Sequence, residues 1–134
     1  MPRRPPARLR VREPEYVQPA PPHARVPRVS ASALRAIAHY ERADLYPGGI
    51  AEALAAWSRF VHAPYRQLDR HTEHGDDYGP SNDPEVARIR LGWALKRLPR
   101  KASRELNTQV RPLDELYLAR SIPAPDVAHL RALL

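Results

Sequence analysis

The residues whose type and spacing could do chemistry in this sequence are two clusters of basic side chains. The first cluster lies in a proline-rich N-terminal arm and consists of Arg3, Arg4, Arg8, Arg10 and Arg12. The second, which we call the basic corner, consists of Lys96, Arg97, Arg100, Lys101 and Arg104. It belongs to a stretch, 88–104, that contains no acidic residue. Basic side chains gathered in this way neutralise phosphates and release their counterions. The leading prediction is therefore a non-enzymatic binding protein for a polyanion, most simply nucleic acid or a ribonucleoprotein.

Each cluster also has an interpretation without a bound phosphate. The arm can be a solvated tail that maintains solubility or docks on a larger complex, and its prolines also suit an aromatic-lined groove on a partner. The corner can be a solvated surface in which one or two arginines pair with Glu41 or Glu105. Arginine is abundant throughout, since 20 of the 22 basic residues are Arg, and GC-rich codons would produce the same bias.

The stretch 84–98 carries two apolar stripes at helical spacing. One stripe is Val86, Ile89 and Trp93; the other is Ala87, Leu91, Leu95 and Leu98. Because a helix with two stripes is contacted on two sides, we expect Trp93, like Trp57, to lie in the core. The competing functional hypothesis makes the first stripe an interface. The chain would then be a protein–protein adaptor or assembly component that binds a protein partner or a second copy, with an arm that orders on the partner.

A third cluster, His71, Glu73, His74, Asp76 and Asp77, supplies nitrogen and oxygen donors. Its spacing, His-x-Glu-His, differs from the His-Glu-x-x-His and His-x-x-Glu-His patterns that place two imidazoles of one helix on a zinc ion. We therefore predict a polar surface loop, with a structural metal and, more remotely, catalysis as alternatives. The sequence also lacks a Gly-rich phosphate loop and a Gly-x-Ser-x-Gly elbow. We assign no catalytic residue, metal or cofactor and expect no enzyme.

Composition narrows the class of protein further. Because the chain has no cysteine, it cannot form disulfides or a thiolate zinc site, and a reducing, cytoplasmic location is expected. The longest apolar run, near 50–56, is far shorter than the roughly 20 residues that a membrane span requires, so no membrane partner is expected. The net charge of +7 is uneven: residues 1–28 hold seven arginines against two glutamates, whereas 15 basic and 13 acidic residues nearly balance in the remainder.

Prolines and capping residues divide the chain into segments. Eight prolines between positions 2 and 27 predict a disordered or extended arm over 1–29. The abundance of Ala and Leu favours helix over strand in the remaining 30–134, which we expect to form one helical domain with an irregular polar loop at 63–82.

Five helical segments are expected within this domain. The first begins at Ser30 or Ser32 and ends near 45, the second covers 50–62, and the third covers 84–98 with Asp83 as its N-cap. Glu41 falls on the apolar face of the first helix, where it needs solvent or a basic partner. Residues 100–120 keep one apolar stripe in phase across Pro112, which favours one kinked helix over two abutting helices. A short helix follows Asp126. The fold class is all-α, a small bundle of four to five helices in which the second and fourth pack on the third.

Overall fold

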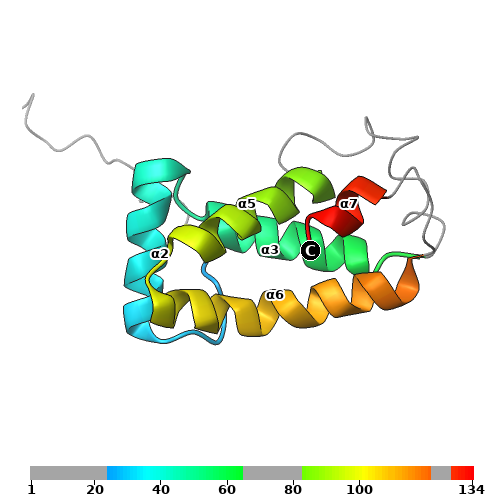
Figure 1. Cartoon of the computed structure of the whole chain (residues 1–134). Helices are drawn as coiled ribbons and strands as arrows, with labels where there is room; N and C mark the ends of the chain where they lie inside the picture. The colour runs from blue at the N-terminus through cyan, green and yellow to red at the C-terminus, as the bar shows by residue number, and fades with distance from the viewer. Residues whose placement is uncertain (1–23, 65–82, 122–127) are drawn as a thin grey trace, which may run out of the picture.

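The computed structural model describes residues 24–64, 83–121 and 128–134, and within these ranges the chain is helical with no strand (Figure 1). The helices are α2 (Ala31–Asp44), α3 (Gly49–Val61), α5 (Pro84–Arg97), α6 (Arg100–Arg120) and α7 (Ala128–Ala132). The all-α fold class predicted from the sequence is confirmed. The first four helices begin and end within a residue or two of the expected positions.

Helices α3, α5 and α6 pack on one another, and α2 crosses one end of the three (Figure 1). The expected packing of the second and fourth helices on the third is confirmed. At the centre, the rings of Trp57, Phe60 and Tyr117 form a cluster with centroids 5.4 to 5.9 Å apart. Leu91 and Leu106 are completely buried beside them. Each buried side chain of this size stabilises the fold by about 1.5–3 kcal/mol.

Local capping residues begin the helices where the sequence places them. The Ser30 hydroxyl accepts the Ala33 N–H at 3.2 Å at the start of α2, and the Asp83 carboxylate accepts the Glu85 N–H at 2.8 Å at the start of α5. Gly48, directly before α3, has φ of 81°, in the left-handed region that side chains disfavour. The turn between α2 and α3 therefore depends on glycine at this position.

Helix α6 continues unbroken across Pro112, so the prediction of one helix is confirmed and the alternative of two helices is wrong. The proline is exposed, whereas Leu106, Val110 and Tyr117 on the apolar stripe are completely buried. Because this stripe packs on both sides of the proline, tertiary contacts hold the helix together where one backbone hydrogen bond is lost.

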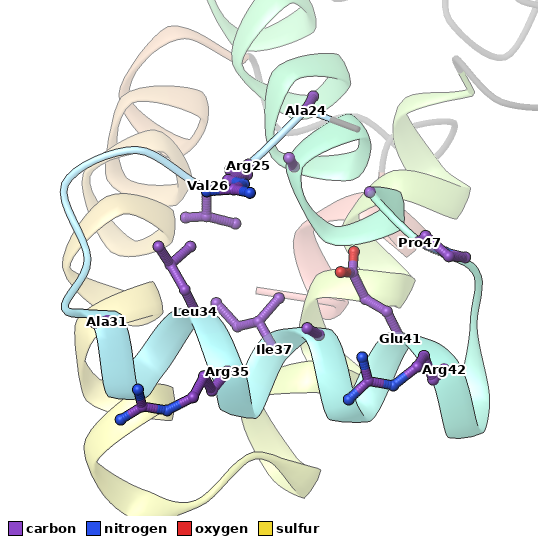
Figure 2. Close-up of a pocket in the computed structure, with 13 residues that line it drawn as sticks. Ala24, Arg25, Val26, Ala31, Leu34, Arg35, Ile37, Glu41, Arg42 and Pro47 are labelled. Carbon is purple, nitrogen blue, oxygen red and sulfur yellow. The ribbon is translucent and has the colours of Figure 1, made fainter. Parts of the chain in front are cut away.

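A carboxylate from α2 caps the start of α3. Glu41 is only 7% exposed, and its Oε2 accepts the Ile50 N–H at 2.9 Å. Figure 2 shows this side chain pointing away from α2. The expectation that Glu41 reaches solvent or a basic partner is wrong, because a backbone amide at the positive end of a helix satisfies it instead.

Two further helix ends are completed by distant side chains. The guanidinium of Arg120, at the end of α6, donates to the carbonyl of Val61, the last residue of α3, and to that of Ala63, two residues beyond. Glu105 of α6 accepts the Ser30 N–H at 2.9 Å and the Ser30 hydroxyl at 2.8 Å, directly before α2. Secondary structure in this bundle is thus completed by tertiary contacts.

The residues directly before α2 lie on the helical body. Val26 is 4% exposed and contributes to the core, and Figure 2 shows it facing Leu34. The Gln109 side chain donates to the Pro27 carbonyl at 2.6 Å. Arg28 then adopts φ of 58°, a left-handed conformation that is uncommon for a residue with a side chain. These contacts fix the direction in which the chain enters α2.

Candidate polyanion-binding surface

The basic corner lies where α5 ends and α6 begins. The connection is short: Leu98, which is 6% exposed and anchors the junction in the core, is followed by Pro99, the N-cap of α6. All five corner side chains are exposed to solvent: Lys96, Arg97, Arg100, Lys101 and Arg104. The junction therefore presents the predicted cations together on the surface.

Two of the corner cations touch the neighbouring helix α2. Arg97 Nη1 lies 3.6 Å from the Asp44 carboxylate, and both side chains are about half exposed. Lys101 Nζ donates to the Ser32 hydroxyl at 3.1 Å. Because contacts between exposed groups contribute little free energy, an incoming anion can replace them at low cost.

The two glutamates considered as counter-ions of the corner have other partners. Hydrogen bonds from the Ser30 N–H and hydroxyl lower the pKa of Glu105, and the nearby charge of Lys101 lowers it further. Glu41 bonds the Ile50 N–H. Among the described residues neither carboxylate bonds an arginine, so the alternative interpretation, in which corner arginines pair with Glu41 or Glu105, is wrong.

The helix ends at the corner carry opposite partial charges. Lys96 and Arg97 occupy the last turn of α5, where a cation is favourable. Arg100, Lys101 and Arg104 lie in the first turns of α6, where the unpaired N–H groups already carry positive potential. That first turn holds no acidic residue, and no described side chain caps it. A bound anion would relieve this accumulation of positive charge.

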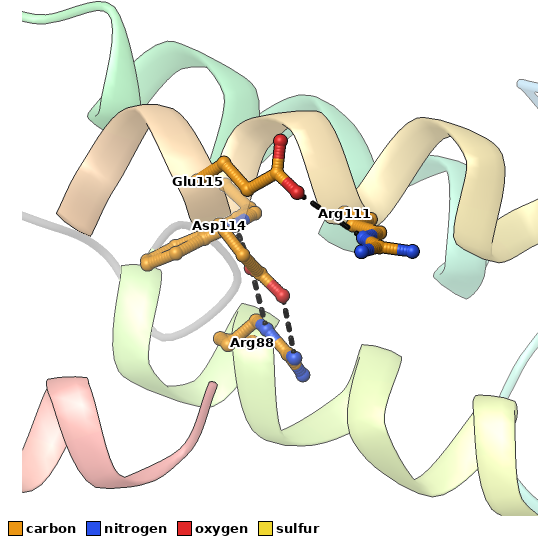
Figure 3. Close-up of polar contacts among 5 residues, drawn as sticks. Arg88, Arg111, Asp114 and Glu115 are labelled. Carbon is orange, nitrogen blue, oxygen red and sulfur yellow. Dashed lines mark hydrogen bonds and ion pairs between the residues drawn. The ribbon is translucent and has the colours of Figure 1, made fainter. Parts of the chain in front are cut away.

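Arg88, in the same acid-free stretch, is not part of this surface. It is 6% exposed and forms two hydrogen bonds with Asp114 of α6, at 2.9 and 2.8 Å (Figure 3). Asp114 also accepts the Trp57 indole N–H at 3.0 Å. A Cβ at Gly92 would lie 3.2 Å from the Arg88 guanidinium, so the glycine leaves room for this arrangement. Arg88 is a structural residue that joins α5 to α6.

Arg90 is also engaged within the protein. Its Nη1 donates to the Tyr46 hydroxyl at 3.1 Å, and its guanidinium carbon lies 5.5 Å from the centre of the Tyr46 ring. Burial and a hydrogen bond to Glu52 raise the pKa of Tyr46, against the lowering effect of Arg90. Of the cations in 88–104, Arg88 and Arg90 therefore contact other residues of the bundle, whereas the five cations of the basic corner are exposed.

The fold adds cations that sequence analysis missed. Arg35, His39 and Arg42 are exposed on α2 at spacings of four and three, so they follow one face of that helix. Between α2 and the corner lies a hollow of about 330 Å³ bordered by His39, Asp44 and Arg97. The α2 residues that meet the corner are Ser32 and Asp44, with His39 at the hollow beside Arg97. Arg35 and Arg42 border a different hollow, which Glu41 and Pro47 also line.

The predicted interface stripe is divided between surface and interior. Trp93 is 55% exposed, and Val86 and Ile89 are partly buried. Trp57, in contrast, has no exposed surface. The expectation of a core position is therefore confirmed for Trp57 and wrong for Trp93.

Several predicted sites fall outside the described residues. They include the arm cations Arg3, Arg4, Arg8, Arg10 and Arg12, and the donor cluster His71, Glu73, His74, Asp76 and Asp77. Within 24–64, 83–121 and 128–134, no three His, Asp or Glu side chains gather at metal-binding distance. None of the helices described there combines the length and the apolar run that crossing a bilayer demands.

Comparisons with protein-family models, curated proteins and solved structures find no significant match to this chain. The function must therefore be argued from the residues themselves.

Proposed function

We propose that this protein is a non-enzymatic binding protein that engages a polyanion, nucleic acid or a ribonucleoprotein, through the basic corner and the N-terminal arm. One observation carries the proposal: all five corner cations are exposed at one helix junction. Glu105, the acid next to them in sequence, accepts hydrogen bonds from Ser30, and Asp44 forms one exposed ion pair with Arg97. The proposal assigns no catalytic residue, metal or cofactor.

Two features of the corner support a phosphate ligand in particular. The start of α6 carries positive potential from its amides as well as from Arg100, Lys101 and Arg104. Helix α2 contributes His39 at the hollow that Arg97 borders, and Arg35 and Arg42 are exposed elsewhere on the same helix. A chain of phosphates, more than a single anion, would use both helices.

The test is the salt dependence of binding to nucleic acid. Each corner cation that neutralises a duplex phosphate contributes about 0.9 to the slope of log Kobs against log salt concentration. Replacing Lys96, Arg97, Arg100, Lys101 and Arg104 by Gln should therefore weaken binding and flatten this slope. Binding that is absent or independent of salt would refute the proposal.

A matched control is available on the same helix. Arg111 is 74% exposed and pairs with Glu115 one turn away, so Arg111→Gln should leave the slope unchanged. Replacing the five arm arginines by Gln in the full chain measures the contribution of the arm separately.

The second candidate function is protein–protein assembly through Val86, Ile89 and Trp93. The exposure of Trp93 favours it, because large aromatic side chains carry much of the binding energy at protein interfaces. In that case Trp93→Ala should weaken self-association or partner binding, measured by sedimentation, and leave the monomer folded.

A further inference from the structure

The exposed Trp93 lies within one helical turn of cations of the basic corner. Lys96 and Arg97 follow it at spacings of three and four, so their exposed side chains project on either side of the indole. Helix α5 thus presents an aromatic ring between positive charges, at the edge of the surface proposed to bind a polyanion.

Next to Trp93 is a groove with apolar walls. It has a volume of about 400 Å³ and is lined in part by Ile89, Gly92, Lys96 and Leu133. Because Gly92 has no side chain, the groove is open beside the indole. The ring and the aliphatic walls suit a flat apolar group, and Lys96 suits an anion attached to it.

We propose that Trp93 stacks on an unpaired base, and that the polyanion is single-stranded nucleic acid. This inference rests on the proposed function and names its ligand class. A base exposes its aromatic face only where it is not stacked inside a duplex, and an aromatic side chain between phosphate-binding cations is the usual platform for such a base. Lys96 borders the groove and Arg97 lies one helical turn from the ring. This combination of an aromatic face with cations favours a ligand that carries both bases and phosphates.

The experiment compares three polyanions with the full-length protein. They are an oligothymidylate of about 12 nucleotides, a duplex of the same length and inorganic polyphosphate, which has no bases. Trp93 is the tryptophan that a ligand can contact, because Trp57 is completely buried, so quenching that is lost in Trp93→Phe reports stacking on Trp93. The oligothymidylate should quench the tryptophan fluorescence, and polyphosphate should not.

Variants then separate stacking from charge. Trp93→Ala should weaken oligothymidylate binding by about 5- to 150-fold, the loss expected for one stacked base, and change polyphosphate binding by less than about twofold. Trp93→Phe should retain part of the affinity. The matched control is Leu118→Ala, which removes the other large exposed apolar side chain among the described residues, 40% exposed on α6. It should change neither affinity.

The remaining outcomes overturn the inference in distinguishable ways. If Trp93→Ala leaves oligothymidylate binding intact while the corner variants weaken all three polyanions, stacking is refuted and the proposed function stands. If no polyanion binds in a salt-dependent manner, the proposed function itself fails. If Trp93→Ala abolishes only self-association or the binding of a protein, the ring belongs to a protein interface.

Discussion

Replacement of Asp114 by alanine should be among the most destabilising single changes in this bundle. Asp114 accepts two hydrogen bonds from Arg88 of α5 and one from the Trp57 indole of α3. One carboxylate thus joins the three helices that enclose the core. The side chains of Arg88 and Asp114 are only 7% and 15% exposed, so water cannot replace the lost partner fully.

The magnitude follows from what the substitution leaves behind. Removing one partner of a buried ion pair costs about 3–5 kcal/mol, because the other charge remains buried and unpaired. The partial exposure of Asp114 admits some water, which places the expected loss near the lower limit, about 3 kcal/mol. Since small domains are stable by about 5–15 kcal/mol in total, the variant should unfold at a much lower urea concentration.

The assay is urea unfolding followed by circular dichroism, with the adjacent residue as control. Glu115 pairs with Arg111 on the exposed side of α6, and both side chains are at least 65% exposed (Figure 3). Glu115→Ala should cost less than about 0.5 kcal/mol, as exposed pairs do. The double variant Arg88→Met, Asp114→Leu should be more stable than Asp114→Ala, because no buried charge remains. Equal losses for Asp114→Ala and Glu115→Ala would refute the argument.

Three further predictions concern helix ends. The pKa of Glu105 is lowered in the fold, so its contribution to stability is present above its unfolded value of 4.5 and is lost as the pH falls through the lower folded value. Glu105→Gln should therefore flatten the acid side of the plot of melting temperature against pH. An unchanged plot would contradict this prediction. Gly48→Ala should lower the free energy of unfolding by about 1–2 kcal/mol, because Gly48 has a left-handed φ. Arg28→Gly should leave stability unchanged or higher, because Arg28 has φ of 58°. The melting temperatures of the two variants test these expectations. Arg120→Ala should lower the free energy of unfolding, measured in urea, by about 1–3 kcal/mol, because two carbonyls at the end of α3 lose their donor. Arg120→Lys should recover little of this free energy, because an ammonium lacks the planar arrangement of donors of a guanidinium.

The helix boundaries were predictable because local signals set them. Ser30 and Asp83 cap the amides two or three positions ahead, and a residue pattern along the chain is enough to recognise such caps. The partner of Glu41 was not predictable, because it is the amide of Ile50 and a backbone amide has no sequence signature. Only the approach of α3 to α2 makes that contact.

The two stripes of α5 show why it is harder to predict which residues are buried than to predict that a segment is helical. Both stripes are apolar, yet the bundle covers the one with Ala87, Leu91 and Leu98, which are at most 6% exposed, and it also buries Ala94. Small side chains let a neighbouring helix approach closely, whereas Trp93 has Lys96 and Arg97 beside it, and covering the ring would also remove these charges from water. On α5 the stripe that is left partly exposed is the one whose Trp93 has Lys96 and Arg97 one turn away.

The same helix caps bear on the electrostatics of the basic corner. Glu105 is the acid closest in sequence to Lys101 and Arg104, and a pattern along the chain pairs it with one of them. In the fold both of its oxygens accept hydrogen bonds from Ser30, 75 residues away. This carboxylate interacts with Lys101 through space and forms no direct bond with it, so the Lys101 side chain stays exposed. The contact that completes α2 thereby also leaves the basic corner, the surface proposed to bind a polyanion, without a direct bond from Glu105.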